Sequence, residues 1–489
     1  MLDPRTPILV GGGQLNQREN PVEPVDMIVQ AARLAEADAG APGLAAQAES
    51  IRIIGMLSWR YQDPGLLVGE RLAAPVRHTV YTGHGGSHAQ ALVNDAAEDI
   101  AAGRCDVVIV GGAEAWRTRT ALRAQGEKPP WTVQAEDLQP SDSRPDVAMR
   151  DEAEVRAGLD RPVYIYPLFE QAIRIGLGRS SDVHRAEIAR LWSSFSEIAE
   201  QNPAAWSQRR VSPEEIENAS PTNRMISWPY TKLMVSNNNV EQAAAVIVCS
   251  VGAARRYGVP EDRWVFLRAG SEASDTGQIA ARPRLNGSPA IKAAAVTAFG
   301  LAGIGVEDLG PVDLYSCFPS AVQVAAREIG FPLNDPSRPL TVTGGLTFAG
   351  GPWNNYTTHA IATMIGEVRR TQQWGLVTAN SGYLTKHSIG LYAPTPGVGF
   401  RRQSGQTEAD REPPTPVAAE YSGSARLESW TVAHGREGEP ERVMAALRTP
   451  DGRRVLAFSE DVDLAKQLVV EDLDGATAVV DSRAAFALE

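Results

Sequence analysis

The stretch from Val80 to Glu114 constrains the fold more than any other part of the 489-residue chain. A glycine-rich turn at 83–86 leads into an alanine-rich segment, Ser87–Ala102, and a glycine follows it, which predicts a helix. Because this segment carries little polar surface, we expect the helix to run through the interior of the protein. Its amino-terminal end presents unpaired backbone N–H groups, which suit an anion or an oxyanion. The apolar run Val107–Val110 predicts a buried strand directly afterwards.

This stretch resembles the nucleophile segment of the thiolase superfamily. In that family a reactive cysteine begins a buried helix, which is followed by an Asp-Val-Val-Ile-type strand and a Gly-Gly-Ala-Glu turn. The resemblance is good from Ala96 to Glu114. At the position where the family carries its cysteine, this chain has Gly86, and Ser87 follows. The resemblance therefore implies a thiolase fold, while the missing cysteine governs the prediction of function.

Length, charge and cysteine content exclude several classes of protein. A chain of 489 residues is too long for one compact core, so two or three domains are expected. The net charge of -12 argues against nucleic-acid binding, which needs a basic surface. The three cysteines suggest neither a disulfide framework nor a thiolate zinc site.

The hydropathy pattern predicts a cytoplasmic protein. No apolar run approaches the ~20 residues that cross a bilayer, so no membrane span is expected. The start, Met1–Gly11, leads into a strand and lacks a basic region before an apolar one, which argues against a signal peptide. The odd number of scattered cysteines also fits a reducing compartment.

Strands and helices alternate through the first half of the chain, residues 1–253. Pro7–Gly12 and Ile51–Ser58 are predicted strands, and Asp26–Ala37 is a predicted amphipathic helix. This alternation predicts a largely parallel sheet that is covered by helices on both faces. The Gly11–Gly13 triplet follows a strand but lacks the spacing of a dinucleotide loop, so no NAD is expected.

Residues 116–235 interrupt the alternating pattern and are predicted to form a loop domain inside the first half. Proline, tryptophan and charged residues crowd this region, and helical periodicity returns only in pieces. An insertion of this size after a core strand is typical of a functional lid. The resemblance to thiolases implies that it covers coenzyme A. Six basic residues are then candidates for contacting CoA phosphates, with solvated surface charge as the alternative for each: Arg117, Arg119, Arg123, Lys128, Arg209 and Arg210.

The second half, residues 254–402, repeats the order of the first. Trp264–Ala269 is a predicted strand, Ala290–Phe299 a helix, Thr341–Thr343 a short strand and Leu376–Gly382 a longer one. A Gly-Gly turn again precedes a helix that leads into a buried strand, which indicates two copies of one unit. The resemblance implies an α/β thiolase fold, in which two similar βαβαβαββ halves form a five-layer αβαβα core.

The chain beyond the second half differs in composition. Residues 403–416 are rich in proline, glutamate and threonine and are predicted to be a linker. Residues 417–489 contain several short alternating strands, which predict a small, barrel-like β-rich domain. This added domain resembles the extra carboxy-terminal domain of an acetyl-CoA acetyltransferase-like subgroup of thiolase-like proteins.

The nucleophile of the thiolase reaction is missing from its usual place. Claisen chemistry needs a thiolate, a base to activate it, an acid/base for the substrate carbon and donors for the thioester oxygens. Gly86 has no side chain that attacks a thioester. Ser87 is a candidate nucleophile, but a hydroxyl needs a neighbouring base, and the alternative is that Ser87 caps the helix.

Two further motifs implied by the resemblance are altered. The family's Gly-His-Pro motif, whose histidine activates the thiol, falls at 350–352 with Gly351 in place of the histidine. Asn354 and Asn355 follow it, either as ligand contacts or as helix caps. The family's motif for an oxyanion-binding water becomes Tyr-Ser-Cys-Phe, where the Tyr315 hydroxyl is still able to donate a hydrogen bond.

The carboxy-terminal Cys-x-Gly motif of the family becomes Asn380-Ser-Gly382. Asn380 cannot exchange a proton with carbon as a thiol does. Gly382 is kept, and we expect its backbone N–H to form an oxyanion hole with that of Gly86 or Ser87. Backbone donors survive the loss of side chains, so this part of the thiolase machinery is predicted to remain.

One pair of side chains is a candidate for replacing the missing groups. Cys317 and His387 lie in segments that the resemblance brings to the floor of one cleft. They are either an activated cysteine–histidine pair or a buried cysteine packed beside a structural histidine. His84 and His88 have the spacing of a metal-binding pair, but no third ligand is evident, so no metal is predicted.

These features predict a thiolase-like protein of lipid or fatty-acyl metabolism that binds coenzyme A or an acyl-CoA beneath the loop domain. If active, it is an acyltransferase, acetyl-CoA acetyltransferase-like by descent, that lacks the Cys-His-Cys set. The alternative is a non-catalytic acyl-CoA-binding subunit or partner protein. A homodimer, or a partner protein held through the added domain, is compatible with both hypotheses.

Overall fold

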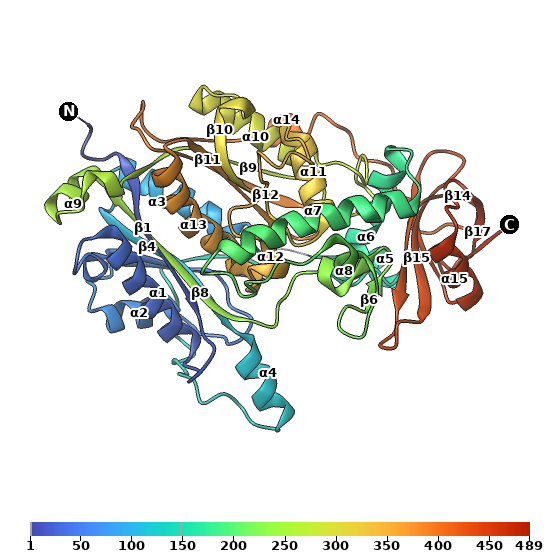
Figure 1. Cartoon of the computed structure of the whole chain (residues 1–489), viewed down its shortest axis with the longest axis horizontal. Helices are drawn as coiled ribbons and strands as arrows, with labels where there is room; N and C mark the ends of the chain where they lie inside the picture. The colour runs from blue at the N-terminus through green and yellow to red at the C-terminus, as the bar shows by residue number, and fades with distance from the viewer. Residues whose placement is uncertain (1, 147–148) are drawn as a thin grey trace.

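The structure is a computed structural model that describes residues 2–146 and 149–489. Figure 1 shows an elongated molecule, with a layered α/β core at one end and the carboxy-terminal domain at the other. Within the described residues, the core contains one mixed sheet of 11 strands, and a second sheet of 7 strands belongs mainly to the carboxy-terminal domain. No helix in this part of the chain is long and apolar enough to span a membrane.

The first half alternates strands and helices as predicted. Strands β2, β3 and β4 pair in parallel, and β8 lies antiparallel between β4 and β1. The elements of this half are β1 (Pro7–Asn16), α1 (Pro24–Ala39), β2 (Ser50–Ile53), α2 (Pro64–Leu72), β3 (His78–Thr82), α3 (His88–Ala101), β4 (Val107–Ala115) and β8 (Glu241–Ser250).

The second half repeats this order with fewer strands. Its sheet runs β10–β11–β12–β9, and β9 pairs with β1, so the sheets of the two halves are continuous. The predicted short strand Thr341–Thr343 is not formed, because these residues instead turn around the buried carboxylate of Asp313, which accepts the Thr341 hydroxyl at 2.8 Å. The elements are β9 (Val265–Ser274), α10 (Pro289–Ala302), β10 (Leu309–Asp313), α11 (Pro319–Ile329), α13 (Tyr356–Thr371), β11 (Trp374–Ser381) and β12 (Lys386–Ala393).

Local sequence signals set the ends of the core helices. The Ser288 side chain caps α10 by accepting the N–H of Ile291 at 3.1 Å. Gly303 ends the same helix in the left-handed conformation, with φ of 72°, which a side chain would disfavour. The bounds of the helix are therefore determined by the sequence around it.

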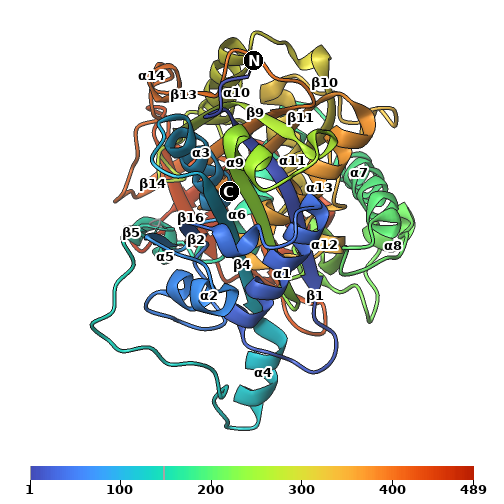
Figure 2. The same ribbon diagram turned by 90° about the vertical axis from the view of Figure 1, so that its left-hand side faces the viewer.

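The core has the predicted five layers. Helices α3 and α13 contact each other and contact strands of both halves, so they form the middle layer. Helices α1 and α2 cover the outer face of the first sheet, and α10 packs against the second sheet and α11 on its outer face. Figure 2, which views the core end of the molecule, shows α1 and α2 on one side and α10 on the other. Because α3 is rich in alanine, the strands of both halves approach it closely.

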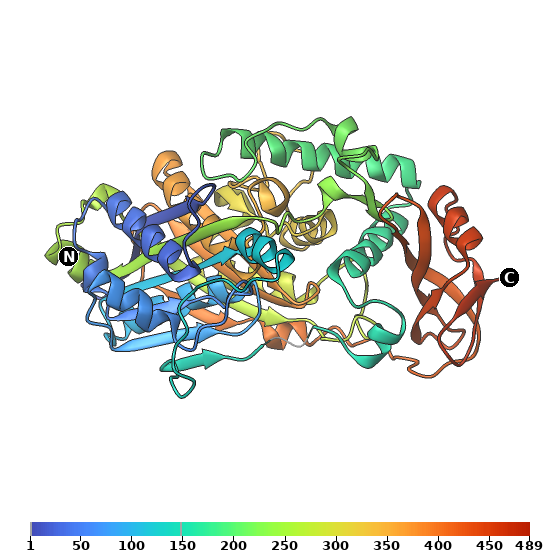
Figure 3. The same cartoon turned by 90° about the horizontal axis from the view of Figure 1, so that it is seen from below.

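The insertion between β4 and β8 forms the loop domain. Strand β5 extends the sheet by pairing in parallel with β3. Helices α6 and α7 pack against α11, and α6 also contacts β14 of the carboxy-terminal domain (Figures 1 and 3). The elements of this domain are α4 (Trp116–Ala124), β5 (Asp142–Arg144), α5 (Glu152–Arg156), α6 (Pro162–Gly176), α7 (Ser181–Gln201), α8 (Pro213–Glu217), β6 (Met225–Ser227) and β7 (Tyr230–Thr231).

The carboxy-terminal domain is an antiparallel sheet in the order β16–β15–β14–β17–β18. An isolated bridge pairs Phe458 of β16 with Ala485, the residue before β18, and full closure into a barrel stays a prediction. The residues 403–416 contain the end of β13 (Arg401–Ser404), which pairs with β9, and the short α14 (Gln406–Ala409). The domain comprises β14 (Gly423–His434), β15 (Pro440–Arg448), β16 (Arg454–Ser459), α15 (Val462–Val470), β17 (Thr477–Val480) and β18 (Phe486–Leu488).

A buried carboxylate joins the loop domain to the core. Glu170 of α6 accepts hydrogen bonds from His184 of α7, Tyr230 of β7 and Gln323 of α11, each at 2.6 Å. All four side chains are buried. A buried charge with three donors is tolerated, whereas a buried donor without its acceptor is costly.

We therefore expect Glu170→Ala to lower the free energy of unfolding by about 3–5 kcal/mol, because it leaves the buried donors of His184 and Gln323 without an acceptor and Tyr230 with Ser320 alone. Urea denaturation of the full chain measures this change. Glu187→Ala is the matched control, since Glu187 pairs with Arg179 at 2.7 Å near the surface, where such a pair contributes about 0–1 kcal/mol. Equal losses for the two variants would show that the Glu170 cluster does not hold the domain.

Candidate functional site

A cavity of about 470 Å³ lies where the first half, the second half and the loop domain meet. Its walls come from the amino-terminal end of α3, the segment before α11, the end of β11 and the start of α6. Six of the residues that the sequence analysis selected line it: Gly86, Tyr315, Cys317, Asn354, Asn380 and Gly382. The fold thus gathers residues that are up to about 300 positions apart, and we call this cavity the cleft.

The place of the missing nucleophile is filled by another side chain. A Cβ atom added to Gly86 would lie 2.7 Å from the Tyr315 hydroxyl oxygen and 2.6 Å from the backbone oxygen of Asn380. Both distances are well below van der Waals contact, so position 86 accepts only glycine while these neighbours stay in place. Glycine at position 86 and tyrosine at position 315 are therefore complementary in shape.

The amino-terminal end of α3 contributes backbone donors to the cleft. The N–H of Gly85 donates to Asn354 Oδ1 at 3.1 Å, and the N–H of Ser87 donates to Ser381 Oγ at 2.7 Å. The N–H groups of Gly86 and Gly382 have no acceptor among the residues that the structure describes. Gly382 adopts a left-handed conformation, with φ of 66°, at the end of β11. Gly86 and Gly382 consequently each leave a backbone donor without an acceptor at the cleft wall.

Ser87 neither caps the helix nor meets a base. It stands at the N-cap position of α3, but its side chain accepts no helix N–H. Its hydroxyl instead shares a hydrogen bond of 2.6 Å with Ser381 Oγ. The ring of His88 points to the backbone oxygen of Gly83, 3.3 Å from Nδ1, and burial lowers the pKa of His88 to about 4.

Cys317 lines the cleft beside two polar groups. Asn380 Nδ2 donates to the Tyr166 hydroxyl at 3.0 Å and lies 3.9 Å from Cys317 Sγ. Burial raises the pKa of the Cys317 thiol to about 12, so the thiol is protonated at neutral pH. The other amide atom, Asn380 Oδ1, is buried and has no partner among the described residues.

The structure does not bring Cys317 and His387 into hydrogen-bond contact. His387 pairs in register with Asn380 across β11 and β12 and does not line the cleft. Its Nε2 atom lies 3.6 Å from Asp275 Oδ2 and 3.4 Å from Ser288 Oγ. His387 thus belongs to a buried polar cluster at the start of α10.

The motif after residue 350 serves mainly to hold the backbone. The N–H of Gly351 donates to the backbone oxygen of Asn237 at 2.9 Å, and Asn355 Nδ2 donates to that of Gly112 at 2.6 Å. Asn354 Nδ2 donates to the Gly55 oxygen at 2.8 Å. Of these three motif residues, only Asn354 reaches the cleft.

None of the six basic residues predicted to meet CoA phosphates lines the cleft. Helix α4, which carries three of them, has no buried residue and projects from the core in Figure 1. Arg209 pairs with Glu215, and Arg210 pairs with Glu197. The cation that does line the cleft is Arg161, at the start of α6, and the sequence analysis did not select it.

The structure adds His84 to the site. Its imidazole lines the cleft, and its Nδ1 atom is buried without a partner among the described residues. Burial lowers the pKa of His84, so the ring is neutral at pH 7 and able to accept a proton. Its place in the glycine-rich turn, two residues before Gly86, was the available sequence signal. Across the described residues, no group of three or more His, Cys, Asp or Glu is arranged to hold a metal ion.

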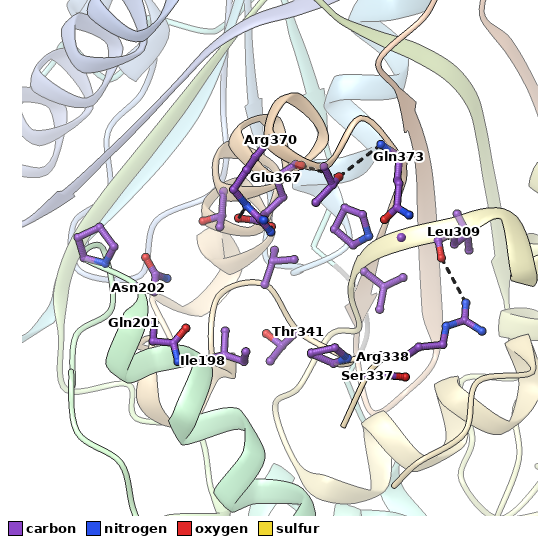
Figure 4. Close-up of a pocket in the computed structure, with 18 residues that line it drawn as sticks. Ile198, Gln201, Asn202, Leu309, Ser337, Arg338, Thr341, Glu367, Arg370 and Gln373 are labelled. Atoms are coloured by element: carbon purple, nitrogen blue, oxygen red, sulfur yellow. Dashed lines mark hydrogen bonds and ion pairs between the residues drawn. The ribbon is translucent and has the colours of Figure 1, made fainter. Parts of the chain in front are cut away.

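A second hollow, of about 670 Å³, lies between the end of α7, β10 and the end of α13 (Figure 4). Its charged groups are engaged within the protein: Arg338 donates to the Leu309 oxygen at 3.3 Å, and Arg370 pairs with Glu367. None of the candidate site residues lines it. The cleft is therefore the candidate functional site.

The layered core and the glycine turn at the cleft define a protein of the thiolase fold. The peroxisomal thiolase of Saccharomyces cerevisiae shares this fold with a TM-score of 0.54 and 13% identity, over 80% of this chain and 98% of the thiolase. The sequence profile of the thiolase-like protein type 1 additional C-terminal domain matches residues 406–483.

A nearer relative shows the family. The monomeric SCP2-thiolase like protein type 1 of Mycobacterium smegmatis is 32% identical over the full length of both chains, with a TM-score of 0.86. The chain belongs to this family of thiolase-like proteins with an additional carboxy-terminal domain. It is also 28% identical over 142 residues to an acetyl-CoA acetyltransferase of Methanocaldococcus jannaschii. That match covers 29% of this chain and only 35% of the acetyltransferase.

The fit between Gly86 and Tyr315 predicts that Gly86→Ala lowers the free energy of unfolding by about 1–3 kcal/mol, because the new methyl group overpacks the cleft wall. Gly300→Ala in α10 is the control, since a Cβ there meets no atom within 4 Å. It should leave stability unchanged or raise it by up to about 1 kcal/mol. Thermal and urea unfolding of both variants measure the difference, and a neutral Gly86→Ala would contradict the close fit.

The raised pKa of Cys317 predicts a slow reaction with iodoacetamide. At pH 7.5 we expect alkylation about 100-fold slower than that of N-acetylcysteine, because little thiolate is present. The rate should rise with pH up to about 12, the pKa of the buried thiol. Peptide mass spectrometry measures the modified fraction, with Cys317→Ser as the blank. Fast alkylation at neutral pH would show that Cys317 is an activated thiolate.

Proposed function

We propose that the cleft binds an acyl-CoA, with the thioester oxygen accepting hydrogen bonds from the N–H groups of Gly86 and Gly382. The observation that carries the proposal is this pair of donors, which belong to residues that line the cleft and have no acceptor among the described residues. Two backbone donors suit a thioester oxygen because they stabilise the negative charge that develops on it during acyl transfer. Arg161 lines the cleft and would meet an anionic part of the ligand.

The proposed chemistry proceeds without an acyl-enzyme. Cys317 is protonated at neutral pH because burial raises its pKa, and the Ser87 hydroxyl is bonded to Ser381 rather than to a base. An acceptor molecule would attack the thioester carbonyl directly, and His84 would take its proton. The C–S bond would then break, and His84 would return the proton to the departing thiolate, so that coenzyme A leaves as the free thiol. This makes the protein an acyltransferase of fatty-acyl metabolism, acting in the cytoplasm. Hydrolysis is the same reaction with water as the acceptor.

The second candidate function is binding without turnover. It is favoured by the lack, among the cleft residues described, of a nucleophile whose pKa is lowered toward neutrality. In that case the protein is an acyl-CoA-binding subunit, and the carboxy-terminal domain contacts a partner protein. The two functions share the same cleft and the same ligand, and turnover of the bound acyl-CoA distinguishes them.

Calorimetric titration with acetyl-CoA and a longer acyl-CoA, combined with intact mass measurement, tests the proposal. We expect noncovalent binding, no acyl adduct, and release of free coenzyme A. His84→Gln should keep the affinity and slow this release by about 100-fold, since general base catalysis contributes that much.

Each outcome separates the alternatives. Binding without any release of coenzyme A would favour the subunit. An acyl group on Cys317 or Ser87 would contradict direct transfer, and no binding of any acyl-CoA would contradict the proposed function itself.

A further inference from the structure

Two buried arginines lie between the carboxy-terminal domain and the cleft. Arg454, the first residue of β16, and Arg282, in the segment before α10, are 0% and 1% exposed. Arginine is rarely buried this completely, because its charge must be matched by acceptors. The acceptors of these two side chains therefore show what the arginines hold in place.

Arg454 joins the carboxy-terminal domain to the core. Its Nε and Nη2 atoms donate to the carboxylate of Glu428 on β14, at 2.7 and 2.9 Å. Its Nη1 atom donates to the backbone oxygens of Ala280 and Arg282, at 2.9 and 2.5 Å. The same core segment is fixed from the loop domain, where Glu154 accepts the N–H of Ile279 at 2.6 Å. Hydrogen bonds from both the carboxy-terminal domain and the loop domain thus hold the backbone of residues 279–282.

Arg282 extends this connection to the cleft. Its Nη2 atom donates to the backbone oxygens of Tyr383 and Leu384, at 2.6 and 2.5 Å, and to Thr385 Oγ1 at 3.1 Å. These residues form the turn between β11 and β12 that begins with Gly382. Leu384 has a φ of 57°, a left-handed conformation that costs free energy in a residue with a side chain. The hydrogen bonds from Arg282 compensate for that cost.

We infer that the carboxy-terminal domain positions the Gly382 N–H in the cleft, with Arg454 and Arg282 as positioning residues. Arg454 holds the backbone at 280–282, which orients the Arg282 side chain, and Arg282 holds the turn 382–385 in its strained conformation. The role given to the Gly382 N–H rests on the proposed function, whereas the effect on the turn does not. The carboxy-terminal domain thereby acts on the site without lining it.

Hydrogen–deuterium exchange of the full chain tests the effect on the turn without any ligand. Arg454→Met removes the donors and keeps the length of the side chain. We expect exchange in peptides that cover residues 382–387 to rise about tenfold, because the hydrogen bonds that hold the turn are weakened. Arg448→Met is the matched control, since Arg448 also donates to Glu428, at 3.0 Å, but makes no direct hydrogen bond to residues 279–282 and meets only Thr415 of the preceding segment, at 3.5 Å. It should leave the turn unchanged, although both variants lower the melting temperature.

The affinity for an acyl-CoA is the second measurement. Arg454→Met should weaken binding about tenfold and Arg448→Met should not, since only the first displaces a donor to the thioester. If Arg454→Met fails to fold, Arg454→Lys replaces it, because lysine keeps the charge but not the planar set of guanidinium donors. We then expect smaller changes, in the same direction, in the exchange rate of the turn and in the affinity for an acyl-CoA.

The outcomes are distinguishable. Unchanged exchange in the turn of a folded Arg454 variant would overturn the positioning role, whatever the ligand does. Faster exchange with unchanged affinity would overturn the link from the turn to the site. Faster exchange in a protein whose wild type binds no acyl-CoA would leave the positioning of the turn standing and contradict the proposed function.

Discussion

The burial of α3 between the two halves of the core is the constraint on which the rest of the structure depends. Its alanine-rich surface lets strands from both halves pack against it, together with α13. A helix enclosed in this way needs acceptors for its first N–H groups, because water is excluded from most of them. In the turn before α3, the N–H groups of Gly85 and Ser87 donate to Asn354 and Ser381, while Gly86 lines the cleft. The fold itself thus supplies the site with a donor that no side-chain substitution removes.

The residues that stand in place of the thiolase catalytic groups pack against one another. Tyr315 occupies the space that a side chain at position 86 would need, so the loss of the nucleophile and the presence of a bulky ring depend on each other. Asn380 bonds to Tyr166, and Ser381 bonds to Ser87, so the end of β11 is bound to both the loop domain and α3. The wall of the cleft is consequently held by hydrogen bonds from both halves of the core and from the loop domain.

At the turn that carries Gly382, the core is connected to both the loop domain and the carboxy-terminal domain. Tyr166 of the loop domain accepts the N–H of Leu384 at 3.1 Å, and Arg282 donates to the backbone on the other side of the same turn. Arg282 lies beside the backbone that Arg454 of the carboxy-terminal domain holds. A strained turn persists only where its surroundings determine it from several directions. The loop domain and the carboxy-terminal domain together meet that requirement here.

The sequence alone determined the repeated strand–helix order and the buried helix after the glycine turn, because these depend on local periodicity and on the residues that end each element. It also selected Gly86, Tyr315, Cys317, Asn354, Asn380 and Gly382, which the fold collects in one cleft. Only the tertiary structure decided which neighbour each side chain meets. It separated His387 from Cys317, kept the basic residues of α4 out of the cleft and brought His84 and Arg161 into it. The physical reason is that hydrogen bonds and buried charges join residues far apart in the chain, and no local pattern records those partners.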